Sequence, residues 1–208
     1  EGMTGDSPDR FLRLWIITLI LIVCMVKPAL VQDSSEATEV LCPSVLGTGL
    51  TTQREFCDIL IGRDPQAGVR VVIPGQSGEA QLSFDLSNRH TYSEEQALAG
   101  LAFAQYTATI GVLTSDGTLL SRGVIQSEFR SVEDLVDRVG GGAGPGGVKA
   151  VAPTGLVRIE VTIPSQVDSV TILGEILEVR RLDGHDIFTS PGRPIAIISN
   201  VEVGYLSR

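Results

Sequence analysis

The stretch that decides the fold is Ala104–Phe129, AQYTATIGVLTSDGTLLSRGVIQSEF. In its first nine residues, apolar or small side chains alternate with polar ones, which is the period of a half-buried antiparallel strand. Ser115-Asp116-Gly117-Thr118 then supplies a tight turn before the next apolar run, Leu119–Phe129. The stretch therefore predicts a β-hairpin with one face in the core.

Similar short apolar runs, separated by turn residues, occupy much of the remaining chain. The turns are marked by Pro74-Gly75, Asp183-Gly184 and Pro191-Gly192. About nine short strands with frequent turns are typical of a β-sandwich. We expect a mostly β, antiparallel sandwich, immunoglobulin-like or jelly-roll, with the strand order left open. The other expected strands are Cys57–Ile61, Val69–Ile73, Ala80–Leu86, Leu156–Ile163, Val170–Val179, Ile195–Ile198 and Val201–Leu206.

One or two short helices are expected as insertions in the sandwich. Ser131 is a suitable N-cap for a helix over Val132–Val139, whose apolar residues follow the helical period and which Gly140 would end. A second helical turn is predicted at Ser93–Leu98, with two acidic or amide side chains in its first turn.

The N-terminal apolar segment, Phe11–Val31, has two interpretations. Its uninterrupted core is short enough for a signal peptide, but the whole segment is about 20 residues and can span a bilayer if Arg13 and Lys27 extend their charges to the two interfaces. Trp15 would then lie in an interfacial belt. Because Ala29-Leu30-Val31 makes a poor cleavage site, we favour a single transmembrane anchor.

The basic residues near that segment predict its orientation. Arg10 and Arg13 precede it, and after Lys27 the next basic residue is Arg54, so residues 1–10 are expected in the cytoplasm. The predicted organisation is then an anchor at 11–31, a linker at 32–41 and a periplasmic sandwich at 42–208. Scarce lysine with abundant alanine, glycine, valine and arginine suggests a GC-rich bacterial source, which places the anchor in the inner membrane.

Three cysteines are consistent with this placement. Cys24 lies within the apolar segment, which leaves Cys42 and Cys57 as a pair in an oxidising compartment. A disulfide between them closes a loop of about 15 residues and contributes roughly 3 kcal/mol. The alternative is two free buried thiols. No Cys-x-x-Cys-His motif is present, so covalent haem is excluded on this chain.

The charge of the chain excludes a nucleic-acid surface. Sixteen Lys and Arg residues stand against twenty-five Asp and Glu, for a net charge of −9 over 208 residues. Nucleic-acid binding needs clustered positive charge. The charges of residues 1–31 cancel, so the acidity belongs to the expected sandwich.

A glycine-rich run, GGGAGPGG, follows the expected helix at 140–147. A phosphate-binding loop would place Gly-Lys-Ser/Thr after a strand and before a helix, whereas here Lys149 follows Val148 and precedes Ala150. A loop that contacts a partner is the favoured interpretation. Its glycines are Gly140, Gly141, Gly142, Gly144, Gly146 and Gly147.

Other polar groups do not form a recognisable catalytic or metal site. Asp183, His185 and Asp186 are adjacent in a predicted turn, where they rarely point the same way, and His90 is the only other histidine. No Gly-x-Ser-x-Gly nucleophile motif occurs. Of the aromatic side chains, only Tyr92 is placed to stack on a sugar. We expect no catalytic residue, no metal and no cofactor.

These features together favour a non-catalytic protein. The leading hypothesis is an accessory subunit of a larger bacterial membrane complex, by analogy respiratory or photosynthetic, whose helix packs in the lipid bilayer against other subunits. The sandwich would brace those partners on the periplasmic side. The alternative is a cell-surface module that binds a glycan or a substrate.

Overall fold

The computed structural model describes residues 38–74, 78–139 and 149–205. They belong to one compact unit, Ser34–Arg208, which is described here by itself. The predicted anchor residues Arg13, Trp15 and Lys27 lie outside the described residues, as does the glycine-rich run. Within the described residues, no helix has both the length and the apolar character needed to span a bilayer.

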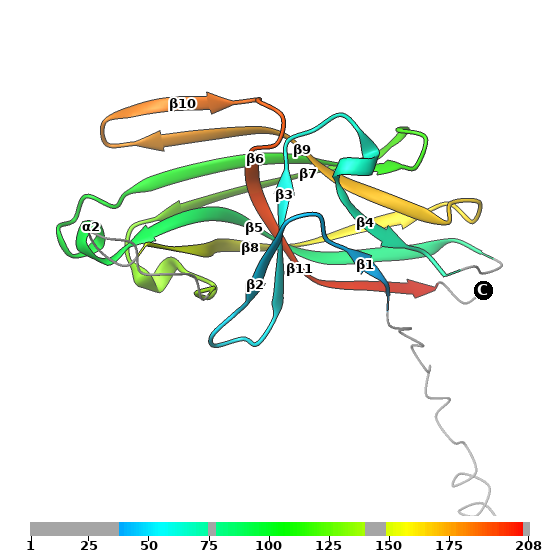
Figure 1. Cartoon of the computed structure of the whole chain (residues 1–208), viewed down its shortest axis with the longest axis horizontal. Coiled ribbons are helices and arrows are strands. Elements are labelled where there is room, and N and C mark those ends of the chain that lie inside the picture. The colour runs from blue at the N-terminus through cyan, green and yellow to red at the C-terminus, as the bar shows by residue number, and fades with distance from the viewer. Residues whose placement is uncertain (1–37, 75–77, 140–148, 206–208) are drawn as a thin grey trace, which may run out of the picture. The chain divides into compact units, whose positions relative to one another are not determined.

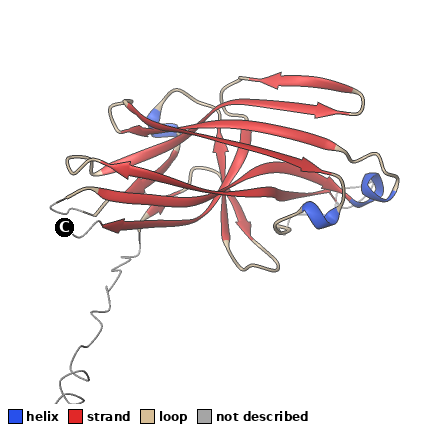
Figure 2. Ribbon diagram, turned by 180° about the vertical axis from the view of Figure 1, so that it is seen from behind, coloured by secondary structure: helices blue, strands red, loops and turns tan. Residues whose placement is uncertain are grey.

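Two antiparallel sheets make up the described part of the chain (Figures 1 and 2). Sheet A has the order β2 (Val45–Thr48), β3 (Glu55–Leu60), β11 (Pro194–Tyr205), β5 (Ala80–Ser93) and β8 (Lys149–Ile163). Sheet B has the order β1 (Val40–Leu41), β4 (Val69–Val72), β9 (Ser169–Arg181), β6 (Ala104–Thr114) and β7 (Leu119–Phe129). A further strand of sheet B, β10 (Gly184–Phe188), pairs with β9.

The core lies between the two sheets, as the alternating patterns predict. Alternate residues of β5 (Leu82, Phe84 and Leu86) are fully buried, and β6 contributes Ala108 and Ile110 from sheet B. A fully buried leucine, isoleucine or phenylalanine side chain contributes about 1.5–3 kcal/mol relative to exposure. The mostly β, antiparallel two-sheet sandwich is therefore confirmed.

The predicted hairpin at Ala104–Phe129 is confirmed with its register. Ala104 pairs with Phe129, and Ile110 pairs with Gly123. In the turn, Gly117 has φ of 85°, a left-handed conformation that glycine adopts without steric penalty. The turn predicted at Asp183-Gly184 likewise joins β9 to β10.

Several strands are longer than the local pattern indicated. β5 continues past Leu86 to Ser93, and β8 begins at Lys149 rather than at Leu156. The two short runs expected at 195–198 and 201–206 form the single strand β11, with a register shift near Asn200. Backbone pairing with neighbouring strands carries these strands through polar residues that interrupt the sequence pattern.

The helix expected over Val132–Val139 is wrong in extent. Ser131 does cap a turn, but only Val132–Asp134 are helical, as one 3₁₀ turn. The chain then becomes extended, because the N–H of Val136 and that of Val139 donate to carbonyls of β8 at 2.8 and 3.3 Å. Tertiary pairing with an edge strand overrides the helical pattern. The second predicted helical turn is confirmed as α2 (Glu94–Leu98).

Candidate functional site

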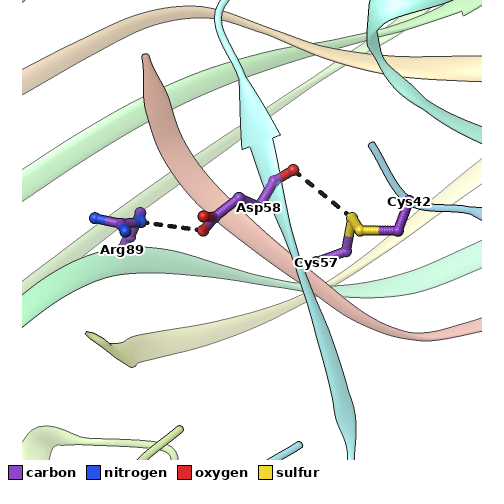
Figure 3. Close-up of a disulfide and its surroundings, with 4 residues drawn as sticks. All are labelled: Cys42, Cys57, Asp58 and Arg89. Carbon is purple, nitrogen blue, oxygen red and sulfur yellow. Dashed lines mark hydrogen bonds and ion pairs between the residues drawn. A yellow bond between two sulfur atoms is a disulfide. The ribbon is translucent and has the colours of Figure 1, made fainter. Parts of the chain in front are cut away.

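The disulfide Cys42–Cys57 is confirmed, and it joins the two sheets (Figure 3). Cys42 follows β1 of sheet B, and Cys57 lies within β3 of sheet A, with Cα atoms 5.9 Å apart. The bridge therefore fixes the point at which the chain enters the sandwich. A groove of about 320 Å³ beside it is lined mainly by residues of β2, β3 and β11.

The next residue along β3, Asp58, points to the opposite side of the strand and pairs with Arg89 of β5 (Figure 3). The Nε of Arg89 donates to Asp58 at 3.0 Å. Burial raises the pKa of the Asp58 carboxyl, and the charge of Arg89 opposes this shift. The pair links β3 to β5. It holds the Arg89 side chain through a single N–H group, its Nε–H.

A second ion-pair cluster on sheet A is satisfied within the protein. The buried carboxylate of Asp85 accepts from Arg54 at 3.0 Å and from Arg158 at 3.1 Å. Arg158 also contacts the Glu202 carboxylate and the Asn200 carbonyl oxygen. Since each of these charges has an opposite partner, the cluster is a structural tie between strands.

His90 and Tyr106 form a buried pair between the sheets. The His90 Nδ1 lies 2.7 Å from the Tyr106 hydroxyl oxygen, and the imidazole stacks on Phe129 with centroids 3.8 Å apart. Burial lowers the pKa of His90 to about 4 and raises that of Tyr106 to about 12. Both groups are therefore neutral at pH 7. The His90 Nε2 is buried and has no hydrogen-bond partner among the described residues.

A pocket of about 220 Å³ lies beside this pair, and we name it the arginine pocket. Arg89 lines it from β5, Arg181 from the end of β9, and Arg193 from the residue before β11. The described lining includes no aspartate or glutamate. The remaining lining residues are His90, Thr91, Gln96, Leu101, Ala102, Phe103, Ala104, Tyr106, Leu177, Val179, Phe188 and Pro194.

The three arginines are held in different ways. Arg89 pairs with Asp58, and Arg181 donates to Asp186 of β10 at 2.6 Å. The Arg193 guanidinium carbon lies 3.5 Å from the centroid of the Phe188 ring, a cation–π contact. In the described part of the chain Arg193 has no ion pair. The three arginines therefore carry three positive charges, and two carboxylates pair with them. One positive charge, that of Arg193, is left without a carboxylate among the described residues.

The β9–β10 hairpin forms an edge of sheet B (Figure 2). Among the described strands, β10 pairs with β9 alone, so its other side presents unpaired backbone groups. Ile187 on β10 is 57% exposed, and Leu182 in the adjoining turn is 67% exposed. This edge combines free main-chain donors and acceptors with exposed apolar side chains.

The polar residues of the predicted turn do not converge. His185 faces Glu178 at 3.8 Å, and Asp186 pairs with Arg181. Within the described ranges no three His, Cys, Asp or Glu side chains are grouped as metal ligands. Tyr92, the candidate for sugar stacking, belongs to β5, but its side chain lies outside what the structure describes.

Sequence reasoning missed the arginine pocket. Its arginines are separated by 92 and 12 residues along the chain; Arg89 and Arg181 lie in strands, and Arg193 precedes one. β5 and β11 belong to sheet A and β9 to sheet B, so only the packing of the two sheets brings the arginines together. A weak local signal existed in Arg89-His90, two polar residues that continue an otherwise alternating strand.

Comparisons with known proteins give weak similarities. No family model matches the chain, and no curated protein matches it. Among solved structures, the K1 cleaved adhesin domain of Lys-gingipain from Porphyromonas gingivalis W83 matches with 9% identity and a TM-score of 0.36, covering 85% of this chain and 95% of that one. The VP2 subviral particle of infectious bursal disease virus matches with 15% identity and a TM-score of 0.24, covering 86% and 43%.

Proposed function

We propose that the sandwich is a jelly-roll and that it serves as the extracytoplasmic part of a non-catalytic, membrane-anchored accessory subunit. The topology is inferred from β3-β11-β5-β8 in sheet A and β4-β9-β6-β7 in sheet B. Among these eight strands, only β6 and β7 are both consecutive and paired. An immunoglobulin-like sandwich pairs several consecutive strands, whereas two Greek keys in a jelly-roll separate them.

The observation that carries the subunit role is the β10 edge. An exposed strand edge is a template for pairing with another chain, and soluble proteins usually protect such edges. Here Ile187 and Leu182 leave apolar surface beside the unpaired backbone. A partner strand added along β10 would extend sheet B and cover both side chains. The partner is proposed to be another subunit of a membrane complex.

The membrane anchor is the second part of the proposal, and the sequence supports it. The apolar segment 11–31, bounded by Arg13 and Lys27, would cross the inner membrane with the sandwich in the periplasm. The disulfide Cys42–Cys57 supports this location, because such bridges persist in oxidising compartments. It would also secure the sandwich at the end of the linker.

Extraction of the full chain in a mild detergent tests the subunit role. We expect co-migration on a native gel with other membrane proteins, which mass spectrometry then identifies; a respiratory or photosynthetic partner would also show a haem or pigment absorbance. Ile187→Glu is expected to release the partners. Val124→Glu is the matched control, because Val124 is 54% exposed on β7, also an edge strand of sheet B. Migration of the wild-type chain alone, or equal release by both variants, would refute the proposal.

A further inference from the structure

The arginine pocket has a property that the subunit role does not explain. Arg89, Arg181 and Arg193 converge on it in a chain whose net charge is −9. Like charges repel, so their convergence is unfavourable unless negative charge compensates it. Among the described residues, two carboxylates pair with these arginines: Asp58 with Arg89 and Asp186 with Arg181.

The charge balance points to a single missing negative charge. Three guanidinium groups and two carboxylates leave a net charge of +1, and the neutral His90 and Tyr106 do not change it. A monoanion would bring the pocket to neutrality. A phosphate dianion would instead leave it with a net negative charge.

The arginines also keep donors available for a ligand. An arginine has five N–H groups, and the described contacts use one on Arg89 and one on Arg181. Arg193 makes no side-chain hydrogen bond within the described chain, and its guanidinium lies over the Phe188 ring, which restricts the motion of the side chain. Such a preordered fork fits the two oxygens of a carboxylate.

The rest of the pocket lining is neutral and partly apolar. It includes Leu101 and Phe188, together with Tyr106, whose hydroxyl oxygen lies 2.7 Å from His90 Nδ1. His90 also lines the pocket, and its Nε2 is buried without a hydrogen-bond partner among the described residues. Buried polar groups nearly always have a hydrogen-bond partner, so an unpaired one beside a pocket points to a ligand that supplies the missing contact.

We propose that the arginine pocket binds a small carboxylate, meaning one carboxylate group on a body of a few heavy atoms. The carboxylate lies between Arg181 and Arg193, with Arg89 at its side, and the body lies against Phe188 and Leu101. The volume of about 220 Å³ is below the range of about 300–1,000 Å³ typical of drug-sized ligands, which limits the body. The pocket shares Asp186 and Phe188 with β10, but binding of a small ligand needs no partner strand, so either proposal can fail alone.

Isothermal titration calorimetry on the full chain in detergent, in a buffer free of carboxylates, tests the site. The probes are lactate and benzoate as free monocarboxylates, glucuronate as the sugar form, and inorganic phosphate and sulfate. We expect at least one of the three carboxylates to bind more tightly than either inorganic anion. Which one binds distinguishes a free acid from an acidic sugar.

Adjacent arginines on β9 provide the matched variants. Arg181 lines the pocket, whereas Arg180, which is exposed to a similar degree, does not. Arg181→Gln and Arg193→Gln are each expected to weaken carboxylate binding about tenfold or more, since charge-assisted hydrogen bonds contribute about 1.5–3 kcal/mol. Arg180→Gln is expected to leave it within about twofold. Preference for phosphate or sulfate, no binding of any carboxylate, or equal losses in the Arg180 and Arg181 variants would overturn the proposal.

Discussion

Acidification from pH 7 to pH 5 is expected to destabilise the sandwich through His90. The imidazole is 5% exposed, stacked on Phe129, and held by the hydroxyl of Tyr106. Burial lowers its pKa from 6.5 to about 4, because a protonated ring would lose its hydration among apolar side chains. In the unfolded chain the same ring is exposed and takes up a proton near pH 6.5.

The size of the effect follows from linkage between protonation and folding. The folded-state pKa lies below the unfolded value, so the stabilisation is complete above about pH 6.5 and declines as the pH falls toward 4. In that window only the unfolded state binds the proton. The free energy of unfolding is expected to fall by about 2 kcal/mol between pH 7 and pH 5, and by about 3 kcal/mol by pH 4.

Urea unfolding of the full chain in detergent, followed by circular dichroism at several pH values, measures this slope. His90→Gln removes the titrating group, so the difference in slope between wild type and variant isolates His90 from the carboxylates. Tyr106→Phe is the control, because it deletes the hydrogen bond but keeps the imidazole buried. We expect the slope to persist in Tyr106→Phe and to flatten in His90→Gln. Equal slopes in wild type and His90→Gln would refute the reasoning.

Three further predictions concern stability and are measured by the same unfolding assay at pH 7. Replacing Cys42 and Cys57 by serine is expected to lower the free energy of unfolding by roughly 3 kcal/mol, and a reductant should then have no further effect on the variant. Asp137→Asn is expected to cost about 2 kcal/mol, because its carboxylate accepts the Thr51 and Thr52 N–H groups; no loss would contradict this role. Gly155→Ala is expected to cost about 1–3 kcal/mol, since Gly155 has φ of 68° and a Cβ there would lie 2.6 Å from the Ser127 Cβ. Gly184→Ala is the control, because a Cβ at Gly184 would have no atom within 4 Å. A similar loss of unfolding free energy in that variant would contradict the steric explanation for Gly155.

The sequence was informative where burial on one side of a strand imposes a period of two. The alternation in Ala104–Val112 and the turn at Asp116-Gly117 predicted both the hairpin and its inward face. The pairing of Cys42 with Cys57 was also accessible, because assigning Cys24 to the apolar segment left these two cysteines as the remaining pair. In each case a short-range pattern is the physical cause of the structure.

Local patterns failed where a distant segment competes for the same backbone groups. Residues 135–139 carry a helical pattern, yet Val136 and Val139 pair with the edge of β8, and the carboxylate of Asp137 accepts from the hairpin loop at Thr51 and Thr52. Burial alone would raise the pKa of Asp137, but hydrogen bonds led by that from the Thr52 hydroxyl lower it to about 2. The ionised carboxylate thus holds the segment extended at neutral pH. A helix over the same residues would forfeit these contacts, and no feature of the segment itself reveals them.

The same distinction explains why the arginine pocket was not predicted. A chain with net charge −9 gives no indication of a cationic site, since composition averages over the whole surface. The position of each arginine depends on strand order: β11 lies between β3 and β5, and β9 lies between β4 and β6. Only this order places Arg193, which precedes β11, beside Arg181 at the end of β9.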